Sequence, residues 1–551
     1  MFYKDTVVDI PKKKRIRRNG IAYVYEILSR KTKKSKEKVV CVGIAITETT
    51  MNPNEKYYEI HKEIKNLEPL KEPPVFDDTI YIGASLLCKK ICKKEGLINI
   101  LEECFPGKSD LIITLAEYYS IRRDSTSQLF KYYLSNHFTN LNYIPSDTEL
   151  SKLFNEQIDN VGIKNFLEKW LKYRLSCKGK CKNIDIDFDS TNRNISSSNI
   201  VAAEYGKAKV DEGLKQINTA YFLDRDTGLP IYFDIYYGSI IDMNHCQIAL
   251  EKVRSIDPEI NGTIVLDRGY FSSKNIEYML KNNINFVFMA KNCKKFNDLI
   301  VENEVSKIAQ PENRIYKTTY GFKTKGKPFE DSSKELNLYL YYNEKDVAIK
   351  SSNLQDQIER ACSFLVGKKD EKGHIENTYG KQIIFTFDPN TKVITSAIPN
   401  YEYLKEYKKT IGYFLIVSNK DESLESILKT YRFRDCVEKE MMHTKSSCDL
   451  NKTFASSDQA FEAKILLGFI SSIVRSALIV KLKPYFLQYS SETSQTVLLE
   501  LDKIKAERFG DSYKLKYALT AKQKQILALF DMTAKHIYES LDLLNQNMAI
   551  I

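Results

Sequence analysis

The sequence predicts an α/β protein with a basic N-terminal region, and three observations support this organisation. Strand and helix patterns alternate from residue 184 to residue 289, and hydrophobic residues make up 43% of the 551 residues. That apolar fraction suffices for packed cores and excludes wholesale disorder. Residues 11–40 hold twelve Lys or Arg and two Glu, which is +10 of the total formal charge of +11. At about 100–200 residues per domain, the length predicts three or four structural units.

A basic hairpin is predicted near the N-terminus, within residues 1–80. Residues 22–28 and 39–45 follow strand patterns, and the polybasic segment 30–38 joins them. Concentrated positive charge favours contact with a polyanion, and a solvated tail is the alternative. The candidate phosphate contacts are lysines at the tip of this hairpin: Lys31, Lys33 and Lys34.

Residues 81–178 are predicted to be helical. Helical patterns cover residues 84–104 and 109–120, with breaks at 94–96 and at Pro106-Gly107, and they continue to about residue 175. A helix-turn-helix DNA-binding element and ordinary packing helices are both compatible with this pattern.

A row of carboxylates begins the central region, residues 179–294. Residues 184–189 alternate apolar and acidic side chains, which predicts a strand with one dry face and Asp185, Asp187 and Asp189 on the other. The elements expected next are strands at 217–223 and 230–236, a helix at 243–255, a strand at 263–267, a helix at 272–282 and a strand at 285–289. This order, β-β-β-α-β-α-β, is the path of an RNase H-like fold.

The second half of the chain is expected to interrupt and then complete this core. Residues 295–405 predict a mostly β insertion, and residues 406–455 a last core strand and a long helix. Residues 456–551 predict a helical C-terminal region, with dimerisation as its expected role. The elements expected are strands at 336–342, 382–387, 393–397 and 412–417, and helices at 353–366 and 422–446.

Three carboxylates stand where such a core could bind metal. Two divalent cations ~4 Å apart need carboxylates on adjacent strands and another from a helix that crosses the sheet edge. The first strand supplies Asp189, the fourth supplies Asp267, and the long helix supplies Glu438. Asp187 shares the face of Asp189.

The long helix also carries a stripe of polar side chains around Glu438. At ~100° per residue, Tyr431, Arg434, Glu438 and Lys445 fall within an arc of about 60°. Arg can bind a phosphate with two N–H groups and Lys adds a point charge, so the stripe suits a phosphodiester. An amphipathic helix with an Arg434–Glu438 ion pair is the alternative.

These motifs resemble those of the DDE transposases of bacterial insertion sequences, in the insertion-sequence-four-like subgroup marked by Y-(2)-R-(3)-E-(6)-K. Residues 189–191, Asp-Ser-Thr, are similar to the first motif of that family, and residues 267–270, Asp-Arg-Gly-Tyr, to the second. The resemblance favours Asp189 over Asp187, because Thr191 completes the first motif. The stripe from Tyr431 to Lys445 matches the third at every spacing. Asp435 stands where some relatives place a Trp that stacks on a flipped base, which leaves open whether ends pass through a DNA hairpin.

The resemblance covers about residues 80–535 and implies both a fold and an activity. The fold would be an RNase H-like catalytic core with a β-rich insertion, a basic N-terminal DNA-binding region and a helical C-terminal region. The activity would be metal-dependent cleavage of transposon ends and joining of their 3′ ends to target DNA, by a homodimer in the DNA complex. Two Mg²⁺ ions, with Mn²⁺ as a substitute, would be held by the catalytic residues Asp189, Asp267 and Glu438. Phosphates near the end would be bound by Tyr431, Arg434 and Lys445.

Two other activities are compatible with these motifs. One is an RNase H-fold nuclease without strand transfer, and the other is a catalytically inactive DNA-binding derivative.

No signal peptide is predicted at Met1, and the eleven cysteines are expected to be reduced thiols. The apolar run 466–480 contains Arg475 and falls short of the ~18–20 residues of a membrane span. The expected location is therefore the bacterial cytoplasm, in association with the nucleoid and without a membrane.

Overall fold

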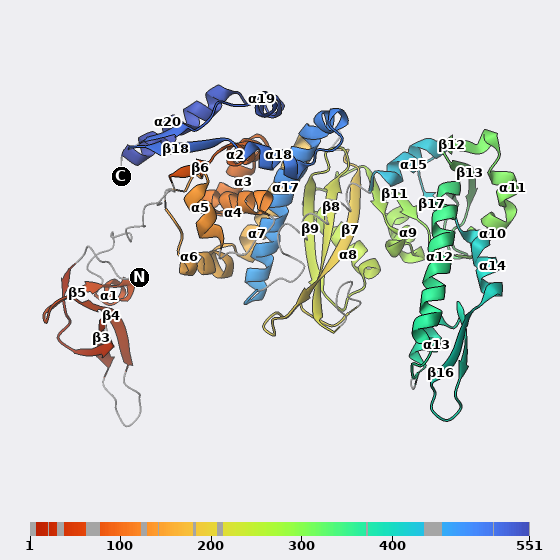
Figure 1. Cartoon of the computed structure of the whole chain (residues 1–551), viewed down its shortest axis with the longest axis horizontal. Helices are drawn as coiled ribbons and strands as arrows, with labels where there is room; N and C mark the ends of the chain where they lie inside the picture. Colours follow the sequence, from red (N-terminus) through yellow and green to blue (C-terminus); the bar gives the residue numbers. More distant parts are fainter. Residues whose placement is uncertain are drawn as a thin grey trace. The chain divides into compact units, whose positions relative to one another are not determined.

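The computed structural model describes residues 7–19, 21–29, 38–61, 78–122, 129–141, 143–179, 183–206, 213–291, 293–370, 373–434, 455–510 and 512–549. The chain divides into two compact units, and Figure 1 labels most of their elements. One unit comprises residues 1–75 with 142–145, and the other comprises residues 76–141 with 146–551.

The first unit is a five-stranded antiparallel sheet in the order β1-β5-β4-β3-β2. Its elements are β1 (Val8–Asp9), β2 (Lys14–Asn19), β3 (Ile21–Ser29), β4 (Lys38–Ala45), β5 (Thr50–Pro53) and α1 (Glu55–His61). Val24, Val42 and Met51 are fully buried in its core. The strands expected at 22–28 and 39–45 are confirmed as β3 and β4. The tip between them lies outside the described residues, and with it Lys31, Lys33 and Lys34.

Strand β2 was not predicted from the sequence. Four of its six residues are Lys or Arg, which obscures the alternation typical of a strand. It pairs with β3 and forms one edge of the sheet. Charged side chains on an edge strand oppose pairing with other edges, so this composition suits the position.

The second unit contains a nine-stranded sheet in the order β12-β13-β14-β17-β11-β10-β7-β8-β9. Its strands are β7 (Ile186–Ile195), β8 (Lys215–Asp224), β9 (Pro230–Tyr237), β10 (Thr263–Leu266), β11 (Asn285–Met289), β12 (Arg314–Tyr316), β13 (Thr319–Gly326), β14 (Leu336–Asn343) and β17 (Tyr413–Ser418). Strands β7, β8 and β9 form an antiparallel meander. Strand β10 is parallel to both β7 and β11, and β17 is antiparallel to β11.

Two helices connect the parallel strands of this sheet. Helix α8 (Asp242–Ile256) leads from β9 to β10, and α9 (Ser273–Lys281) leads from β10 to β11. Every strand and helix expected between residues 184 and 289 is thereby confirmed, with boundaries that move by one or two residues, except that β7 continues to Ile195. The end of β10 lies beside the first half of β7, because Leu266 pairs with Phe188 and β7 continues to Ile195.

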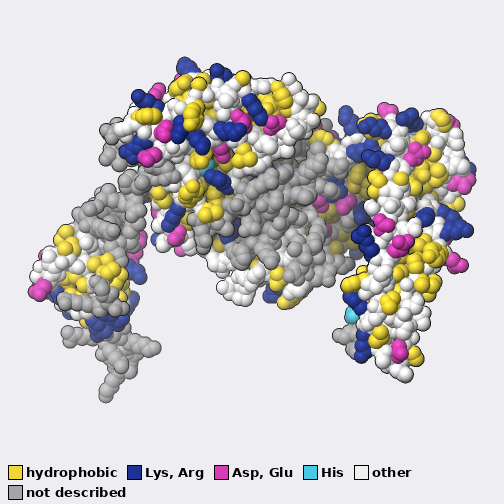
Figure 2. All heavy atoms as spheres, in the orientation of Figure 1, with side chains coloured by type: hydrophobic (Ala, Val, Ile, Leu, Met, Phe, Trp, Pro, Cys, Tyr) yellow, Lys and Arg dark blue, Asp and Glu magenta, His cyan; other side chains and the backbone are white. Residues whose placement is uncertain are grey.

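Residues 294–410 are more helical than the sequence suggested. Strands β12, β13 and β14 extend the main sheet, whereas β15 and β16 form a separate hairpin. The other elements here are α10 (Lys294–Glu302), α11 (Val305–Ile308), α12 (Glu344–Leu365), α13 (His374–Tyr379), β15 (Ile383–Phe387), β16 (Ile394–Pro399) and α14 (Tyr401–Thr410). Helix α12 begins earlier than predicted because the Asn343 side chain accepts a hydrogen bond from the Lys345 N–H and caps it. Figure 2 shows hydrophobic side chains at the surface of the arm formed by α12 and the hairpin.

A helical bundle packs beside β9. Its helices are α2 (Gly83–Lys94), α3 (Leu97–Cys104), α4 (Ser109–Ile121), α5 (Phe130–Asn136), α6 (Asp147–Lys152), a π-helical turn (Leu153–Gln157), α7 (Asn160–Ser176), α17 (Asp458–Gln488), α18 (Ser494–Leu501), α19 (Ala521–Ala528) and α20 (Ala534–Ala549). The indole N–H of Trp170 on α7 donates to the carbonyl oxygen of Pro230 at 2.9 Å. Phe469 on α17 contacts the rings of Phe166 and Phe233. These contacts fix the bundle to the outer strand of the sheet.

Helix α17 is the central helix of the bundle. It is long and apolar enough to cross a membrane, and 83% of its most apolar window is buried inside the protein. Neighbouring helices bury α17. This burial explains why the apolar part of the helix extends beyond residues 466–480. Burial among other helices is the ordinary reason for a helix that is apolar all round.

The C-terminal region contains strands that the sequence analysis did not predict. Strands β18 (Lys505–Phe509) and β19 (Ser512–Leu515) pair with each other, and β18 also pairs with β6 (Thr79–Tyr81). The partner strand lies more than 400 residues earlier in the sequence. The expectation that residues 456–551 are entirely helical was wrong, because these strands are only five and four residues long and the pairing of β18 with β6 leaves no local signal.

Candidate active site

Two aspartates lie on neighbouring parallel strands, at the level where β10 ends. Asp189 is part of β7, and Asp267 directly follows β10. Leu266 pairs with Phe188, so each aspartate is the next residue along its strand from this pair. The side chains are 18% and 35% exposed respectively, so both can reach a ligand from solvent.

Local hydrogen bonds orient both carboxylates. Asp189 Oδ1 accepts from the backbone N–H of Ser190 at 2.8 Å. Asp267 Oδ1 accepts from the backbone N–H of Arg268 at 2.7 Å and caps a single 3₁₀ turn, Arg268–Tyr270. The buried Tyr270 then donates its hydroxyl to Ser190 Oγ at 2.5 Å. This bond ties the turn after Asp267 to the strand that carries Asp189.

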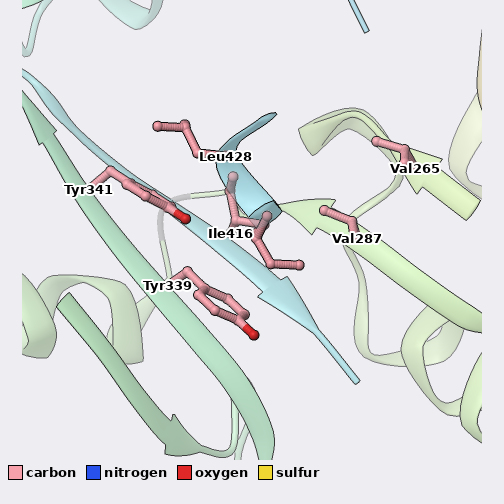
Figure 3. Close-up of a cluster of buried hydrophobic side chains, with 7 residues drawn as sticks. Val265, Val287, Tyr339, Tyr341, Ile416 and Leu428 are labelled. Atoms are coloured by element: carbon pink, nitrogen blue, oxygen red, sulfur yellow. The ribbon is translucent and has the colours of Figure 1, made fainter. Parts of the chain in front are cut away.

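Helix α15 (Leu424–Arg432) packs on the sheet beside these aspartates. Ser423 caps its start by accepting from the N–H of Ser426. Its apolar face belongs to a buried cluster shared with β10, β11, β14 and β17, and Figure 3 shows Leu428 from α15 above the side chains of these strands. The members of this cluster are Val265, Val287, Tyr339, Tyr341, Ile416, Ile427 and Leu428. Tyr431 packs against the same cluster, so the burial of α15 brings its last turn toward Asp267.

Arg434 joins the two aspartates. Its Nη2 lies 3.0 Å from Asp189 Oδ2, and its Nη1 lies 3.2 Å from Asp267 Oδ1. Nη1 also donates to the Tyr431 hydroxyl at 3.4 Å, and this hydroxyl lies 3.5 Å from Asp267 Oδ1. Only 6% of the Arg434 side chain is exposed. The planar fork of a guanidinium suits such a bridge between two carboxylates.

The charge of Arg434 is stabilised by this arrangement. Burial would lower the pKa of the Arg434 guanidinium, but the nearby carboxylates of Asp189 and Asp267 raise it above its already high usual value. Arg434 therefore stays protonated and balances two negative charges. The two carboxylates consequently face a common cationic position.

Asp187 lies beneath this site. Its side chain is 1% exposed, and neither of its oxygens accepts a hydrogen bond from the described residues. The Nε of Arg225 lies 3.6 Å from its Oδ2. Burial raises the pKa of Asp187 to about 7, against the opposing effects of Arg225 and Arg434. Of the two aspartates on this face of β7, only Asp189 is open to a ligand from solvent.

The predicted site residues are therefore only partly covered by the structure. Asp189, Asp267, Tyr431 and Arg434 lie together, whereas Glu438 and Lys445 lie outside the described residues. Arg434 and Tyr431, which we expected to bind phosphate, contact the aspartates. Arg225 was missed, because a single Arg beside the turn residues of a hairpin has no distinguishing sequence pattern.

The donor chemistry of the site fits a hard divalent cation. Within the described ranges, no three His, Cys, Asp or Glu side chains are grouped so that they could hold a metal. Asp189 and Asp267 nevertheless present carboxylate oxygens to one position, where a cationic group is already bound. Carboxylate oxygens are the ligands that Mg²⁺ uses in proteins, usually one or two together with water and phosphate oxygens.

Comparisons with known proteins place this region in a known family. Residues 181–474, more than half of the chain, match the family model described as a transposase DDE domain. No curated protein matches the chain. Among solved structures, the chain is similar to the piggyBac transposase in a cryo-EM structure of its synaptic complex with hairpin DNA. That similarity has 9% sequence identity and a TM-score of 0.30, over 88% of this chain and 80% of the other.

Proposed function

Because the chain belongs to the transposase DDE domain family, we propose that it is a transposase that cleaves the ends of its own insertion sequence. In this proposal it then joins the freed 3′ ends to target DNA. Its partners are transposon-end DNA, target DNA and a second copy of the chain. Its location is the bacterial cytoplasm, in association with the nucleoid.

One observation carries the proposal: a single guanidinium bridges Asp189 and Asp267. Two neighbouring carboxylates on adjacent strands repel each other unless a cation lies between them. Arg434 supplies that positive charge at 3.0 Å and 3.2 Å. A pair of carboxylates that is built around a cation, and is still partly exposed, is a suitable place for divalent metal and a phosphodiester.

The strand order supports an RNase H-like core. Strands β9, β8, β7, β10 and β11 are consecutive neighbours, of which the first three are antiparallel and the last two run parallel to β7. The two aspartates then lie on the central strands of this set. In this proposal Glu438, from the chain that follows α15, completes the set of carboxylates.

Two Mg²⁺ ions would be held by Asp189, Asp267 and Glu438, and Mn²⁺ would substitute for them. When bound, such ions would supply activation of water and stabilisation of charge on the scissile phosphate. The side chains have separate tasks. Asp189 and Asp267 are held in place by backbone N–H groups, so they need little reorganisation to accept a ligand.

Arg434, Tyr431 and Lys445 would bind phosphates of the transposon end. Arg434 and Tyr431 support each other through their hydrogen bond. A DNA phosphate brought near the aspartates would compete for the Arg434 guanidinium, because Arg binds phosphate with two parallel N–H groups. Bound DNA would in this way draw the guanidinium from the carboxylates toward its own phosphate.

The test is cleavage of the natural end by the purified full chain. A DNA fragment that spans one end of the flanking inverted repeats is incubated with protein and Mg²⁺, and cut positions are mapped. We expect a nick at the boundary of the repeat. Asp267→Ala should abolish the nick and leave DNA binding intact.

The matched control is Asp421→Ala. Asp421 also pairs with cations of the same sheet, Lys323 and Lys325, but not with Arg434. Its loss should leave cleavage at the wild-type rate. Wild-type cleavage by the Asp267→Ala protein would show that the site is misassigned.

A further inference from the structure

Arg225 joins the strand that carries Asp189 to the end of helix α15. It directly follows β8, whose last residue pairs with Ile186 of β7. Its backbone N–H donates to the carbonyl oxygen of Asp185 at 2.9 Å. Its side chain is 11% exposed. The backbone of Arg225 is thus fixed to the sheet at the first strand of the site.

The guanidinium of Arg225 binds the last turn of α15. Its Nη2 donates to the carbonyl oxygen of Thr430 at 2.7 Å. The last four carbonyl groups of a helix have no partner within the helix, and a cation there also interacts favourably with the helix dipole. This hydrogen bond therefore satisfies the backbone at the point where α15 ends.

The same guanidinium contacts the residue just before Arg434. Cζ of Arg225 lies 5.3 Å from the centre of the Phe433 ring, a cation–π contact. The Nζ of Lys483 on α17 lies 5.6 Å from the centre of this ring. Phe433 is therefore held by cations from two elements that are distant in sequence. Its neighbour Arg434 leaves the helix from a restrained position.

A buried carboxylate holds Arg225 from the side of the sheet. Asp187 Oδ2 lies 3.6 Å from the Nε of Arg225, and Asp187 is two residues before Asp189 on the same strand. Desolvation of a buried ion pair can cost more than its Coulomb attraction returns, so such a pair is weak evidence of stabilisation. The ion pair of Arg225 and Asp187 lies between the strand of Asp189 and the end of α15. Its role is therefore better explained by the positions in which it holds these two elements.

We propose that Arg225 is a positioning residue of the catalytic site, which holds the end of α15 on the sheet so that Arg434 reaches both aspartates. The catalytic consequence rests on the proposed function, whereas the restraint of α15 does not. A catalytic group displaced by about 1 Å can lose about 100-fold in rate. Loss of Arg225 should therefore slow the chemical step without removing any group that contacts the DNA.

The experiment compares Arg225→Lys and Arg225→Met in the full chain with Arg174→Met. Lys keeps a charge near Asp187 but lacks the planar fork that reaches Thr430, and Met removes the charge as well. Arg174 is the matched control. It is 7% exposed, pairs with Glu95 and Asp224, and lies over the Trp170 ring, and none of these partners belongs to α15.

Three quantities are measured for each variant: the single-turnover cleavage rate at saturating DNA, DNA affinity, and hydrogen exchange of residues 424–434. For both Arg225 variants we expect a rate loss of about 10–100-fold, unchanged DNA affinity and faster exchange in the last turn of α15. Arg174→Met should change neither the rate nor this exchange. If the Arg225→Met protein does not fold, the Arg225→Lys protein alone tests whether Arg225 restrains α15.

The inference is overturned if the exchange of residues 424–434 is the same in the Arg225 variants as in wild type. It is also overturned if Arg174→Met has the same effects, because the role would then be general stability. Failure of the proposed function would look different. The wild-type protein would not cleave its ends, while the exchange comparison would still decide whether Arg225 restrains α15.

Discussion

At the scale of single residues, the site depends on a contact between side chains that are far apart in sequence. Arg434 and Asp189 are separated by 245 positions, yet their charged atoms lie 3.0 Å apart. The sequence predicted strands for Asp189 and before Asp267, but it placed Arg434 within a single helix over residues 422–446, whereas α15 ends at Arg432. The bridge itself could not be predicted, because it depends on where the end of α15 lies on the folded sheet.

When Arg434 is replaced by Met, the stability of the fold should depend more strongly on bound divalent metal. Asp189 and Asp267 would lose the cation between them, and we expect a cost of about 1–3 kcal/mol, below the range for fully buried pairs because both carboxylates are partly exposed. Added Mg²⁺ should then raise the melting temperature of Arg434→Met more than that of wild type. Equal shifts in the two proteins would show that the carboxylates do not share a metal position.

Glu117 provides a test of pH dependence away from this site. It is buried on α4 and accepts a hydrogen bond from the Tyr133 hydroxyl at 3.1 Å. Burial raises the pKa of Glu117 to about 7, although Lys89, Ser85 and Tyr133 oppose the rise and Asp502 adds to it. Because the folded pKa exceeds the unfolded value, this contribution to stability is fully present at acid pH and is lost as pH rises toward 7.

Glu117→Gln should remove that loss. Gln stays neutral and can still accept from Tyr133, so the variant should gain on the order of 2 kcal/mol relative to wild type between pH 5 and pH 8. Urea unfolding at the two pH values measures the difference. Parallel changes in the stability of both proteins would mean that Glu117 ionises normally in the fold.

At the scale of elements, the sequence was informative wherever a pattern was local. The alternation in residues 184–189 and the apolar run at 263–266 predicted β7 and β10, and both are present. Strands β18 and β19 were missed because both are short and because β18 also pairs with β6, which is distant in sequence. Helix α12 was predicted too short, since its first turns are mostly exposed and their helical pattern is weak.

The packing of α15 should matter for chemistry as well as stability. Leu428 is 3% exposed within the cluster that seats this helix. Leu428→Ala should cost about 2–5 kcal/mol and should also slow end cleavage per folded molecule, because Tyr431 lies on the same helix and Arg434 follows its end. Leu365→Ala is the control, since Leu365 is 5% exposed in a separate cluster around α12. Equal cleavage rates in the two folded variants would remove the link between α15 packing and catalysis.

At the scale of the whole molecule, positive charge and carboxylates belong to different units. Residues 11–40 carry most of the net charge and fall in the first unit, whereas Asp189 and Asp267 fall in the second. We expect the first unit to contribute DNA affinity that is independent of cleavage.

The salt dependence of DNA binding tests this division. Replacing Lys31, Lys33 and Lys34 by Gln should flatten the slope of log K against log salt by up to ~0.9 for each lost phosphate contact. Lys405, Lys408 and Lys409, exposed on α14, form a control set of equal charge. A slope that changes equally in both sets would mean that only total charge matters.

The most direct test of the transposase assignment is the joining reaction. Purified full chain is incubated with Mg²⁺, a supercoiled target plasmid and transposon ends already cut to expose their 3′ hydroxyl groups, and the products are sequenced. We predict covalent joints between these 3′ ends and target DNA, which disappear in Asp189→Asn protein and when the metal is chelated. Cleavage of intact ends without any joints would contradict the assignment and would identify a nuclease that lacks strand transfer.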